Sequence, residues 1–308
     1  MSTTTPDSHA LFPGKPFIST VLEALETKTT MAGVLGRRYV MRAAMAGILA
    51  ALMYTTYFAL VAGFDDVAVG SSTLAVLGRV LGGLTFGWAL VFIYYSRSEL
   101  LTSNMMIVSI GAYHRRIRAG RALRLLGLCY LGNVVGGLLV AVFLRFSTIA
   151  DGAVLDQMTS AVEHKLAYVS GGPTGWGDLL VRAILCNFCI NLAMLLVYNG
   201  RLKDDVSKSL VMIVAVFVFA FLGLEHSVAN TVLFSVVGLK EGLDLGLAAG
   251  NLGIALLGNF VGGGLLIGVY YAYANDDSRW LRDRPAADRR ARHGRPVVTP
   301  PAPPTSWT

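Results

Sequence analysis

Charged residues are scarce in this chain. Only 15% of its 308 residues are Asp, Glu, Lys or Arg, whereas 54% are hydrophobic and the mean hydropathy is +0.59. Soluble domains contain about 25% charged residues, so this composition excludes an ordinary soluble protein. A helix needs roughly 20 mostly apolar residues to cross a bilayer. The sequence predicts an all-α integral membrane protein with six transmembrane helices, at about residues 41–63, 74–110, 125–146, 178–199, 209–238 and 248–274.

Cysteine is also rare, and Cys129, Cys186 and Cys189 all lie in predicted spans. Cys186 and Cys189 share a helix face, but no His or carboxylate cluster completes the spacing of a metal site. We therefore interpret all three as small apolar side chains. No metal, cofactor or catalytic residue is expected, because the sequence also lacks a nucleophile with a neighbouring base.

The segments before and after the apolar stretches are polar. Residues 1–40 do not resemble a secretory signal peptide, and the first apolar run is long enough to remain as a helix. The residues after 274 contain seven Arg and several Pro and cannot form a core. We expect a cytoplasmic N-terminal segment (1–40), a transmembrane domain (41–274) and a basic, Pro-rich, disordered cytoplasmic tail (275–308).

Basic residues are distributed unevenly along the chain. Most of the 26 Lys and Arg lie up to Arg42, at Arg115–Arg124, at Arg201–Lys208 and at Arg279–Arg295. With six spans these segments share one side of the membrane, and the positive-inside rule places that side, with both termini, in the cytoplasm. The net charge of +7 then reflects topology and lipid headgroup contacts, not nucleic-acid binding. A multi-pass protein of the plasma (inner) membrane is expected.

Two of the apolar stretches are too long for a simple crossing and contain polar interruptions. Residues 74–110 include Ser96-Arg97-Ser98-Glu99, and residues 209–238 include Glu225-His226-Ser227. Non-helical backbone at membrane depth is tolerated where it lines a cavity or is buried in protein, so we expect broken second and fifth helices. Ionisable side chains inside a membrane usually face a pathway. The Glu225-His226 pair therefore predicts a transport path.

The two halves of the membrane region share a sequence repeat. An offset of 126 residues relates four pairs: Glu99 and Glu225, Asn104 and Asn230, Gly132 and Gly258, and Asn133 and Asn259. Because each half, at about 41–146 and 178–274, contains three spans, the second half must be inverted relative to the first. Inverted repeats with broken helices are typical of transporters. The glycines of the Gly-Asn segments are attributed to close helix packing.

Together these motifs resemble the formate/nitrite transporter family over roughly residues 30–275. The resemblance lies in the order of six spans with two breaks, in Leu100-Leu101-Thr102-Ser103-Asn104, in the run Gly223–Asn230 and in the Gly-Asn-Phe-Val-Gly-Gly-Gly segment that begins at Gly258. It implies an aquaporin-like fold, a homopentamer with one pore in each subunit, and small monovalent anions such as formate, nitrite or hydrosulfide as substrates. The expected partners are therefore a small anionic substrate, the lipid bilayer and further copies of the chain.

The resemblance also implies roles for individual residues. His226 resembles the central pore histidine of the family, and Thr102 resembles the threonine of the first break. Asn187 and Asn230 resemble pore-associated amides, and Glu225 matches the acid beside the histidine. The remaining positions resemble two apolar constrictions and a vestibule lysine: Phe86, Leu90 and Leu101 in one constriction, Phe219 and Ile190 in the other, and Lys165 in the vestibule.

Two positions depart from the family pattern. Leu101 stands where an aromatic residue is commonest, so this constriction is expected to be wider or more mobile. Arg97 places a permanent charge where the family usually has a small residue. Arg97 either pairs with Glu99 or draws anions inward, and the sequence leaves both interpretations open.

These positions suggest a mechanism. An anion that enters an apolar constriction loses hydration worth many kcal/mol, so protonation of the anion becomes easier than crossing as a charge. Lys165 would raise the local anion concentration. His226, whose imidazole changes charge near neutral pH, would supply a proton or a hydrogen bond.

Structural roles remain open for the same residues. Glu225 could hold His226 only to satisfy backbone groups at the break, Thr102 could do the same in its loop, the apolar side chains could simply pack, and Lys165 could be a solvated loop charge. The main functional alternative is a channel for neutral solutes such as water or glycerol, although the sequence lacks paired Asn-Pro-Ala motifs. A membrane-integral enzyme or receptor is disfavoured, because there is no cofactor motif or large soluble domain.

Overall fold

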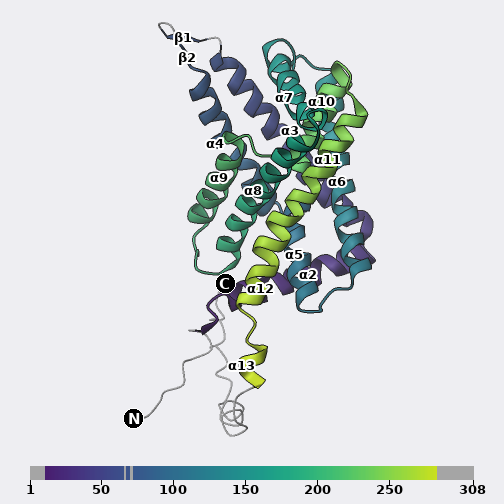
Figure 1. Ribbon diagram of the computed structural model, residues 1–308, viewed down its shortest axis with the longest axis vertical. Helices are drawn as coiled ribbons and strands as arrows, with labels where there is room; N and C mark the ends of the chain where they lie inside the picture. Colours follow the sequence, from purple (N-terminus) through teal and green to yellow (C-terminus); the bar gives the residue numbers. More distant parts are fainter. Residues whose placement is uncertain (1–10, 66, 70–71, 283–308) are drawn as a thin grey trace, which may run out of the picture.

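The computed structural model describes residues 11–65, 67–69 and 72–282, and these residues form an almost entirely helical bundle (Figure 1). A short hairpin, in which β1 (Ala68–Val69) pairs antiparallel with β2 (Ser72–Thr73), interrupts the helices at one end. The helices are, in chain order, α2 (Lys15–Val34), α3 (Gly36–Asp65), α4 (Ala75–Tyr95), α5 (Leu101–Tyr113), α6 (Ala119–Arg145), α7 (Ala153–Ser170), α8 (Gly172–Tyr198), α9 (Asp205–Phe221), α10 (Ser227–Lys240), α11 (Leu245–Asn259), the π-helix η1 (Phe260–Val269), α12 (Tyr270–Ala274) and α13 (Ser278–Arg282).

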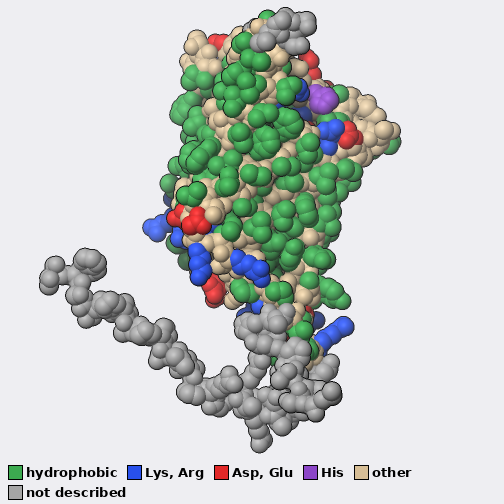
Figure 2. All heavy atoms as spheres, turned by 90° about the vertical axis from the view of Figure 1, so that its left-hand side faces the viewer, with side chains coloured by type: hydrophobic (Ala, Val, Ile, Leu, Met, Phe, Trp, Pro, Cys, Tyr) green, Lys and Arg blue, Asp and Glu red, His purple; other side chains and the backbone are tan. Residues whose placement is uncertain are grey.

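Five helical stretches of the described residues are long and apolar enough to cross a membrane: α3, α4, α6, α8 and the stretch Leu245–Arg282. Apolar side chains cover most of the face seen in Figure 2, and charged side chains gather towards its ends. The predicted stretch 209–238 behaves differently, because it is divided between α9 with 17 residues and α10 with 14. Neither helix is long enough to cross a bilayer alone.

Two of the predicted spans each contain two helices joined by a short non-helical segment. Residues 96–100 separate α4 from α5, and residues 222–226 separate α9 from α10. Both preceding helices end in the same way, because Arg97 and Gly223 adopt positive φ angles of 55° and 63°. The following backbone N–H then donates to a carbonyl of the last helical turn, over 3.0 Å at the first end and 2.9 Å at the second. A left-handed residue closes a helix in this manner.

Small residues let helices approach closely at equivalent positions of the two halves. A Cβ atom at Gly136 would lie 1.8 Å from the carbonyl oxygen of Ala44, and one at Gly262 would lie 2.0 Å from that of Ile184. A larger side chain would therefore force α6 away from α3, or η1 away from α8. The packing role predicted for the Gly-Asn segments is confirmed at these two positions.

The structure differs from the sequence-based expectation at both ends of the membrane domain. Half of the predicted polar N-terminal segment forms α2, which buries Phe17 and Val21 in the core. Disorder is expected from residue 275 onward, but Ser278–Arg282 is helical. The backbone N–H of Gly14 donates to Asn275 Oδ1 over 2.7 Å, so contact with the N-terminal region orders the start of the tail. Residues 1–10 and 283–308 lie outside the described residues.

Candidate functional site

Equivalent hydrogen bonds hold the two non-helical segments, so the sequence repeat corresponds to a structural one. The Asn133 side chain donates to the carbonyl of Glu99 over 2.8 Å and accepts from the first backbone N–H of α5 over 3.0 Å. The Asn259 side chain donates to the carbonyl of Glu225 over 2.9 Å and accepts from the first N–H of α10 over 2.9 Å. Each amide thus satisfies backbone groups that the helix ends leave unpaired. The asparagines of the Gly-Asn segments therefore bind the non-helical backbone, a role beyond the helix packing predicted for these segments.

Glu225 is the acid of a buried polar network. Its side chain is 1% exposed, its Oε1 lies 2.8 Å from Lys165 Nζ, and its Oε2 accepts from Asn230 Nδ2 over 2.5 Å. Asn230 also donates to Asn251 Oδ1 over 2.9 Å. Burial of a carboxylate requires this combination of a paired charge and hydrogen bonds. Glu225 and Asn230 therefore lie together, as their spacing in the sequence suggests.

Glu99 occupies the equivalent place in the first half. Its side chain is 4% exposed, forms an ion pair with Lys28 of α2, and accepts from Asn104 Nδ2 over 3.1 Å. Asn104 also donates to the hydroxyl of Tyr39 over 3.0 Å. The interpretation in which Arg97 pairs with Glu99 is wrong, because α2 places the ammonium of Lys28 against this carboxylate instead.

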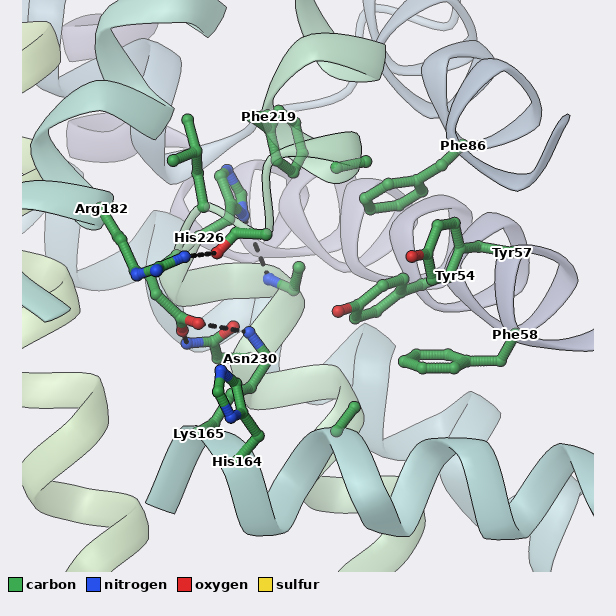
Figure 3. A pocket seen from close by; sticks show the side chains of 16 residues that line it. Tyr54, Tyr57, Phe58, Phe86, His164, Lys165, Arg182, Phe219, His226 and Asn230 are labelled. Atoms are coloured by element: carbon green, nitrogen blue, oxygen red, sulfur yellow. Dashed lines mark hydrogen bonds and ion pairs between the residues drawn. The ribbon is translucent and has the colours of Figure 1, made fainter. Parts of the chain in front are cut away.

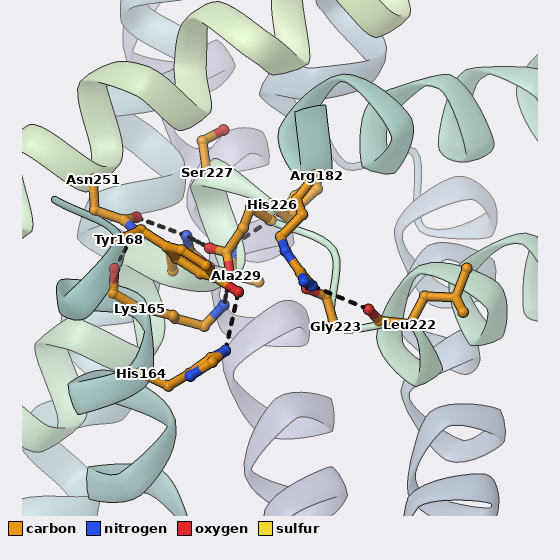
Figure 4. Close-up of polar contacts among 12 residues, drawn as sticks. His164, Lys165, Tyr168, Arg182, Leu222, Gly223, His226, Ser227, Ala229 and Asn251 are labelled. Atoms are coloured by element: carbon orange, nitrogen blue, oxygen red, sulfur yellow. Dashed lines mark hydrogen bonds and ion pairs between the residues drawn. The ribbon is translucent and has the colours of Figure 1, made fainter. Parts of the chain in front are cut away.

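Lys165 does not lie in a loop. It belongs to α7, is 8% exposed, and its ammonium contacts Glu225 (Figure 4). The interpretation as a solvated loop charge is wrong, because α7 packs against the bundle and carries Lys165 into it. On the same helix, His164 and Tyr168 form a hydrogen bond of 3.0 Å between Nε2 and the hydroxyl.

Arg182 is fixed near the same site. Its guanidinium donates to the carbonyls of Leu222 and Gly223 over 3.4 and 3.1 Å, and to Asp178 Oδ1 over 2.9 Å (Figure 4). It also lies 5.5 Å from the centre of the Tyr168 ring. The cation therefore holds the end of α9 next to the Glu225 network.

A hydrogen bond joins the two halves at His226 and Thr102. Both side chains are buried, and His226 Nε2 lies 3.0 Å from Thr102 Oγ1. His226 Nδ1 accepts from the backbone N–H of Ala229 over 3.1 Å. A neutral imidazole has one donor and one acceptor nitrogen, so the proton lies on Nε2 and faces Thr102. Protonation of Nδ1 would break the bond to Ala229.

The backbone of Thr102 is held by amides of α8. Asn187 Nδ2 and Asn191 Nδ2 each donate to the Thr102 carbonyl over 3.2 Å. Asn187 also donates to the carbonyl of Asn259 over 2.6 Å. Asn187 therefore lies at the junction of the two halves, and its amide positions backbone there.

His226 lines a cavity of about 170 Å³, which we call the α7-side cavity. Figure 3 shows an aromatic wall opposite a polar one, with Phe219 next to His226 at one end. The labelled aromatic wall contains Tyr54, Tyr57, Phe58 and Phe86, and the labelled polar wall contains His164, Lys165, Arg182 and Asn230.

Phe86 and Phe219 form one apolar contact at this cavity. Their ring centres are 5.7 Å apart, and Phe219 stacks on His226 at 5.8 Å. Leu90, one helical turn after Phe86, lines a second cavity. Phe86 and Leu90, which were predicted to belong to one constriction, therefore line different cavities. Leu101 and Ile190 are buried between helices, and neither lines these two cavities.

The second cavity has a volume of about 690 Å³, and we call it the α2-side cavity. Leu100 and Ser103, which flank Thr102 closely in the chain, line it together with Lys28 and Glu99. The Thr102–His226 hydrogen bond therefore connects a residue that lines the α7-side cavity to the segment whose residues Leu100 and Ser103 line the α2-side cavity.

Sequence reasoning missed several residues of the site. Asn191 and Asn251 are polar residues inside apolar helices, and the rule that such residues mark functional positions could have found them. Lys28 carries no such signal, because it lies outside every apolar stretch. Within residues 11–65, 67–69 and 72–282 there is no group of three or more His, Cys, Asp or Glu that could hold a metal ion.

Residues 16–273 match the sequence profile of the family described as formate/nitrite transporter. The formate channel FocA of Haemophilus influenzae is 30% identical over 220 residues, which cover 64% of this chain and 74% of FocA. The nitrite transporter NirC of Salmonella typhimurium is 29% identical over 231 residues, which cover 71% of this chain and 81% of NirC.

Two solved structures share the fold. A structure described as an FNT family ion channel superposes with a TM-score of 0.72 at 24% identity, over 84% of this chain and 99% of that chain. A pentameric formate channel with formate bound gives a TM-score of 0.60 at 20% identity, over 77% and 96%. Since the profile spans most of the sequence and the fold agrees, this chain is a multi-pass membrane protein that belongs to the formate/nitrite transporter family.

Proposed function

We propose that this chain conducts small monovalent anions of weak acids, such as formate or nitrite, along a passage between the α7-side and α2-side cavities. The observation that carries the proposal is the buried Thr102–His226 hydrogen bond, which connects a lining residue of the α7-side cavity to the segment that lines the α2-side cavity through Leu100 and Ser103. The choice of substrate class is supported by the relatives, which are named as a formate channel and a nitrite transporter.

In this proposal α4 with α5 and α9 with α10 each act as one broken span, which gives six crossings. The equivalent helix ends at Arg97 and Gly223 support an inverted repeat. So does the opposite placement of α5 and α10, since α5 lies nearer α12 and α10 lies nearer α7 (Figure 1). An even number of crossings, with most basic residues on one side, supports cytoplasmic termini in a plasma (inner) membrane.

The passage we propose combines apolar contacts with a hydrogen-bond donor. Phe86 and Phe219 at one side of His226, and Leu90 at the other, remove water from an anion, and the loss of hydration favours its protonated form. Lys165 and Arg182 attract anions to the α7-side cavity. The Nε2–H of His226 is the group that can donate a hydrogen bond to the anion, because Nδ1 is engaged with Ala229. Loss of this proton from a neutral imidazole would leave an imidazolate, so the proton passes to the anion only if a second proton from solution binds Nδ1 and displaces the Ala229 N–H.

Uptake by proteoliposomes of the purified chain tests this proposal. Formate, nitrite and hydrosulfide are compared with glycerol and water, with and without an inward proton gradient. We expect saturable flux of at least one anion that increases with the proton gradient. Flux of glycerol or water alone would instead place the chain among neutral-solute channels.

Substitution of His226 isolates the proton step. His226→Phe removes the Nε2 donor, so we expect the pH dependence of anion flux to change. His114→Phe is a suitable control, because His114 lies at the end of α5 and lines neither cavity. Equal pH profiles for His226→Phe and the wild type would contradict a proton-transfer role for His226.

A further inference from the structure

The backbone of Arg97 adopts a conformation that favours glycine. Its φ is 55°, and its counterpart 126 residues later is Gly223, with φ 63°. The left-handed conformation is costly for residues with a Cβ atom and costs glycine nothing. The first half of the chain thus carries a long cationic side chain at a position where glycine would satisfy the backbone better. Backbone strain of this kind often accompanies functional positions.

The side chain of Arg97 lines the α2-side cavity, as does Arg42. The segment that carries Arg97 contacts the backbone at Arg42, because the N–H of Glu99 donates to the carbonyl of Arg42 over 3.3 Å. Among the described residues, neither guanidinium forms an ion pair with a carboxylate. Arg42 donates instead to the thioether of Met31 over 2.8 Å. Arg42 and Arg97, neither of which pairs with a carboxylate of the described residues, therefore both line one cavity.

The other cations at the two cavities are compensated. Lys28 and Lys208, which also line the α2-side cavity, pair with Glu99 and Asp205. At the α7-side cavity Lys165 pairs with Glu225 at 2.8 Å. Arg182 pairs with Asp178, one helical turn away, at 2.9 Å. Of the cations that line the two cavities, Arg42 and Arg97 are the ones without a carboxylate partner in the described part of the chain. Their charge makes the α2-side cavity the stronger attractor of anions.

We propose that Arg97 and Arg42 form an anion-binding site in the α2-side cavity that selects planar oxyanions, such as a carboxylate or nitrite, over hydrosulfide. The inference rests on the proposed function and assigns its substrate class. A guanidinium presents a planar fork of N–H donors that matches two oxygens of one anion. Hydrosulfide has a single sulfur atom and cannot use that fork. An ammonium offers charge without the fork, so Arg and Lys are not equivalent at such a site.

Initial rates of formate and hydrosulfide uptake by proteoliposomes test the site, with Arg97→Lys and Arg97→Gln compared with the wild type. For Arg97→Gln we expect the half-saturating formate concentration to rise about tenfold, the effect of losing one charge-assisted hydrogen bond. For Arg97→Lys we expect a several-fold rise for formate and little change for hydrosulfide. Arg115→Lys and Arg115→Gln are matched controls, because Arg115 is also exposed with φ 56° and lines neither cavity.

Binding of formate to the detergent-purified chain, measured by saturation-transfer NMR, separates this inference from the proposed function. Weaker binding by Arg97→Gln and Arg97→Lys, but not by the Arg115 variants, would support the site even if no anion is transported. Equal formate binding and uptake by the wild type and both Arg97 variants would overturn it. So would an Arg97→Lys variant that retains the wild-type preference for formate over hydrosulfide.

Discussion

Arg97 combines a left-handed backbone conformation, which destabilises the fold, with a side chain that we propose binds anions. Substitution by glycine tests the two effects separately. The left-handed conformation costs roughly 1–2 kcal/mol for a residue with a Cβ atom, whereas glycine loses about 0.5–1 kcal/mol through its larger freedom in the unfolded chain. We expect Arg97→Gly to retain or slightly raise the free energy of unfolding while it weakens formate binding. Thermal unfolding in detergent measures the first quantity. A clear loss of stability would show that the guanidinium holds the fold together.

Asn259 holds the backbone of two different segments through one side-chain amide. Its amide donates to the carbonyls of Ala183 and Glu225 over 2.8 and 2.9 Å and accepts from the N–H of Ser227. Asn259→Ala leaves the buried carbonyl of Glu225 and the buried N–H of Ser227 without their partner, so we expect a loss of at least about 2 kcal/mol of stability. Asn199→Ala, at the end of α8, is the control. Similar thermal midpoints for the two variants would contradict this role.

Buried ion pairs connect elements that lie far apart in the sequence. Lys165 of α7 and Glu225 of the segment between α9 and α10 are the clearest example. Removal of one partner leaves an uncompensated buried charge, which costs about 3–5 kcal/mol, whereas removal of both costs much less. We therefore expect Lys165→Met to destabilise the protein more than the double variant Lys165→Met/Glu225→Gln. The free energy of unfolding in detergent is measured for the wild type, both single variants and the double variant. If the losses of the two single variants add up to that of the double variant, the two side chains are not coupled.

The apolar surface of the whole molecule requires lipid or protein partners. Large side chains such as Phe143 and Tyr270 are exposed on it, and the pentameric formate channel shares the fold. We expect five copies to associate, so native mass spectrometry in a mild detergent should give about five times the chain mass of 32.9 kDa. A single chain mass across several detergents would refute the pentamer, and it would leave the passage within each chain unaffected.

The elements of the fold differ in how well their positions followed from the sequence. The helix ends near Ser96 and Leu222 are each followed within a few residues by polar side chains, so the local sequence indicates that the helices end there. The helix α7 was missed, because residues 153–170 are too polar to signal a span. The separation of Phe86 from Leu90 was also missed, because helical spacing does not say which cavity a side chain faces.

By itself the sequence determined the membrane class, the apolar helices and the repeat, because chain length, hydration cost and spacing are local properties. The same reasoning proposed Glu225, His226 and Asn230 for the site, whereas Thr102 was proposed from the family resemblance. Only the tertiary structure decided which cations compensate the two buried acids and which remain free. Those pairings depend on how α2 and α7 pack against the other helices. The close contacts at Gly136 and Gly262 fix α6 against α3 and η1 against α8, and α2 and α7 pack on α3 and α8 in turn. That Arg97 has no carboxylate partner among the described residues is therefore a property of the folded molecule.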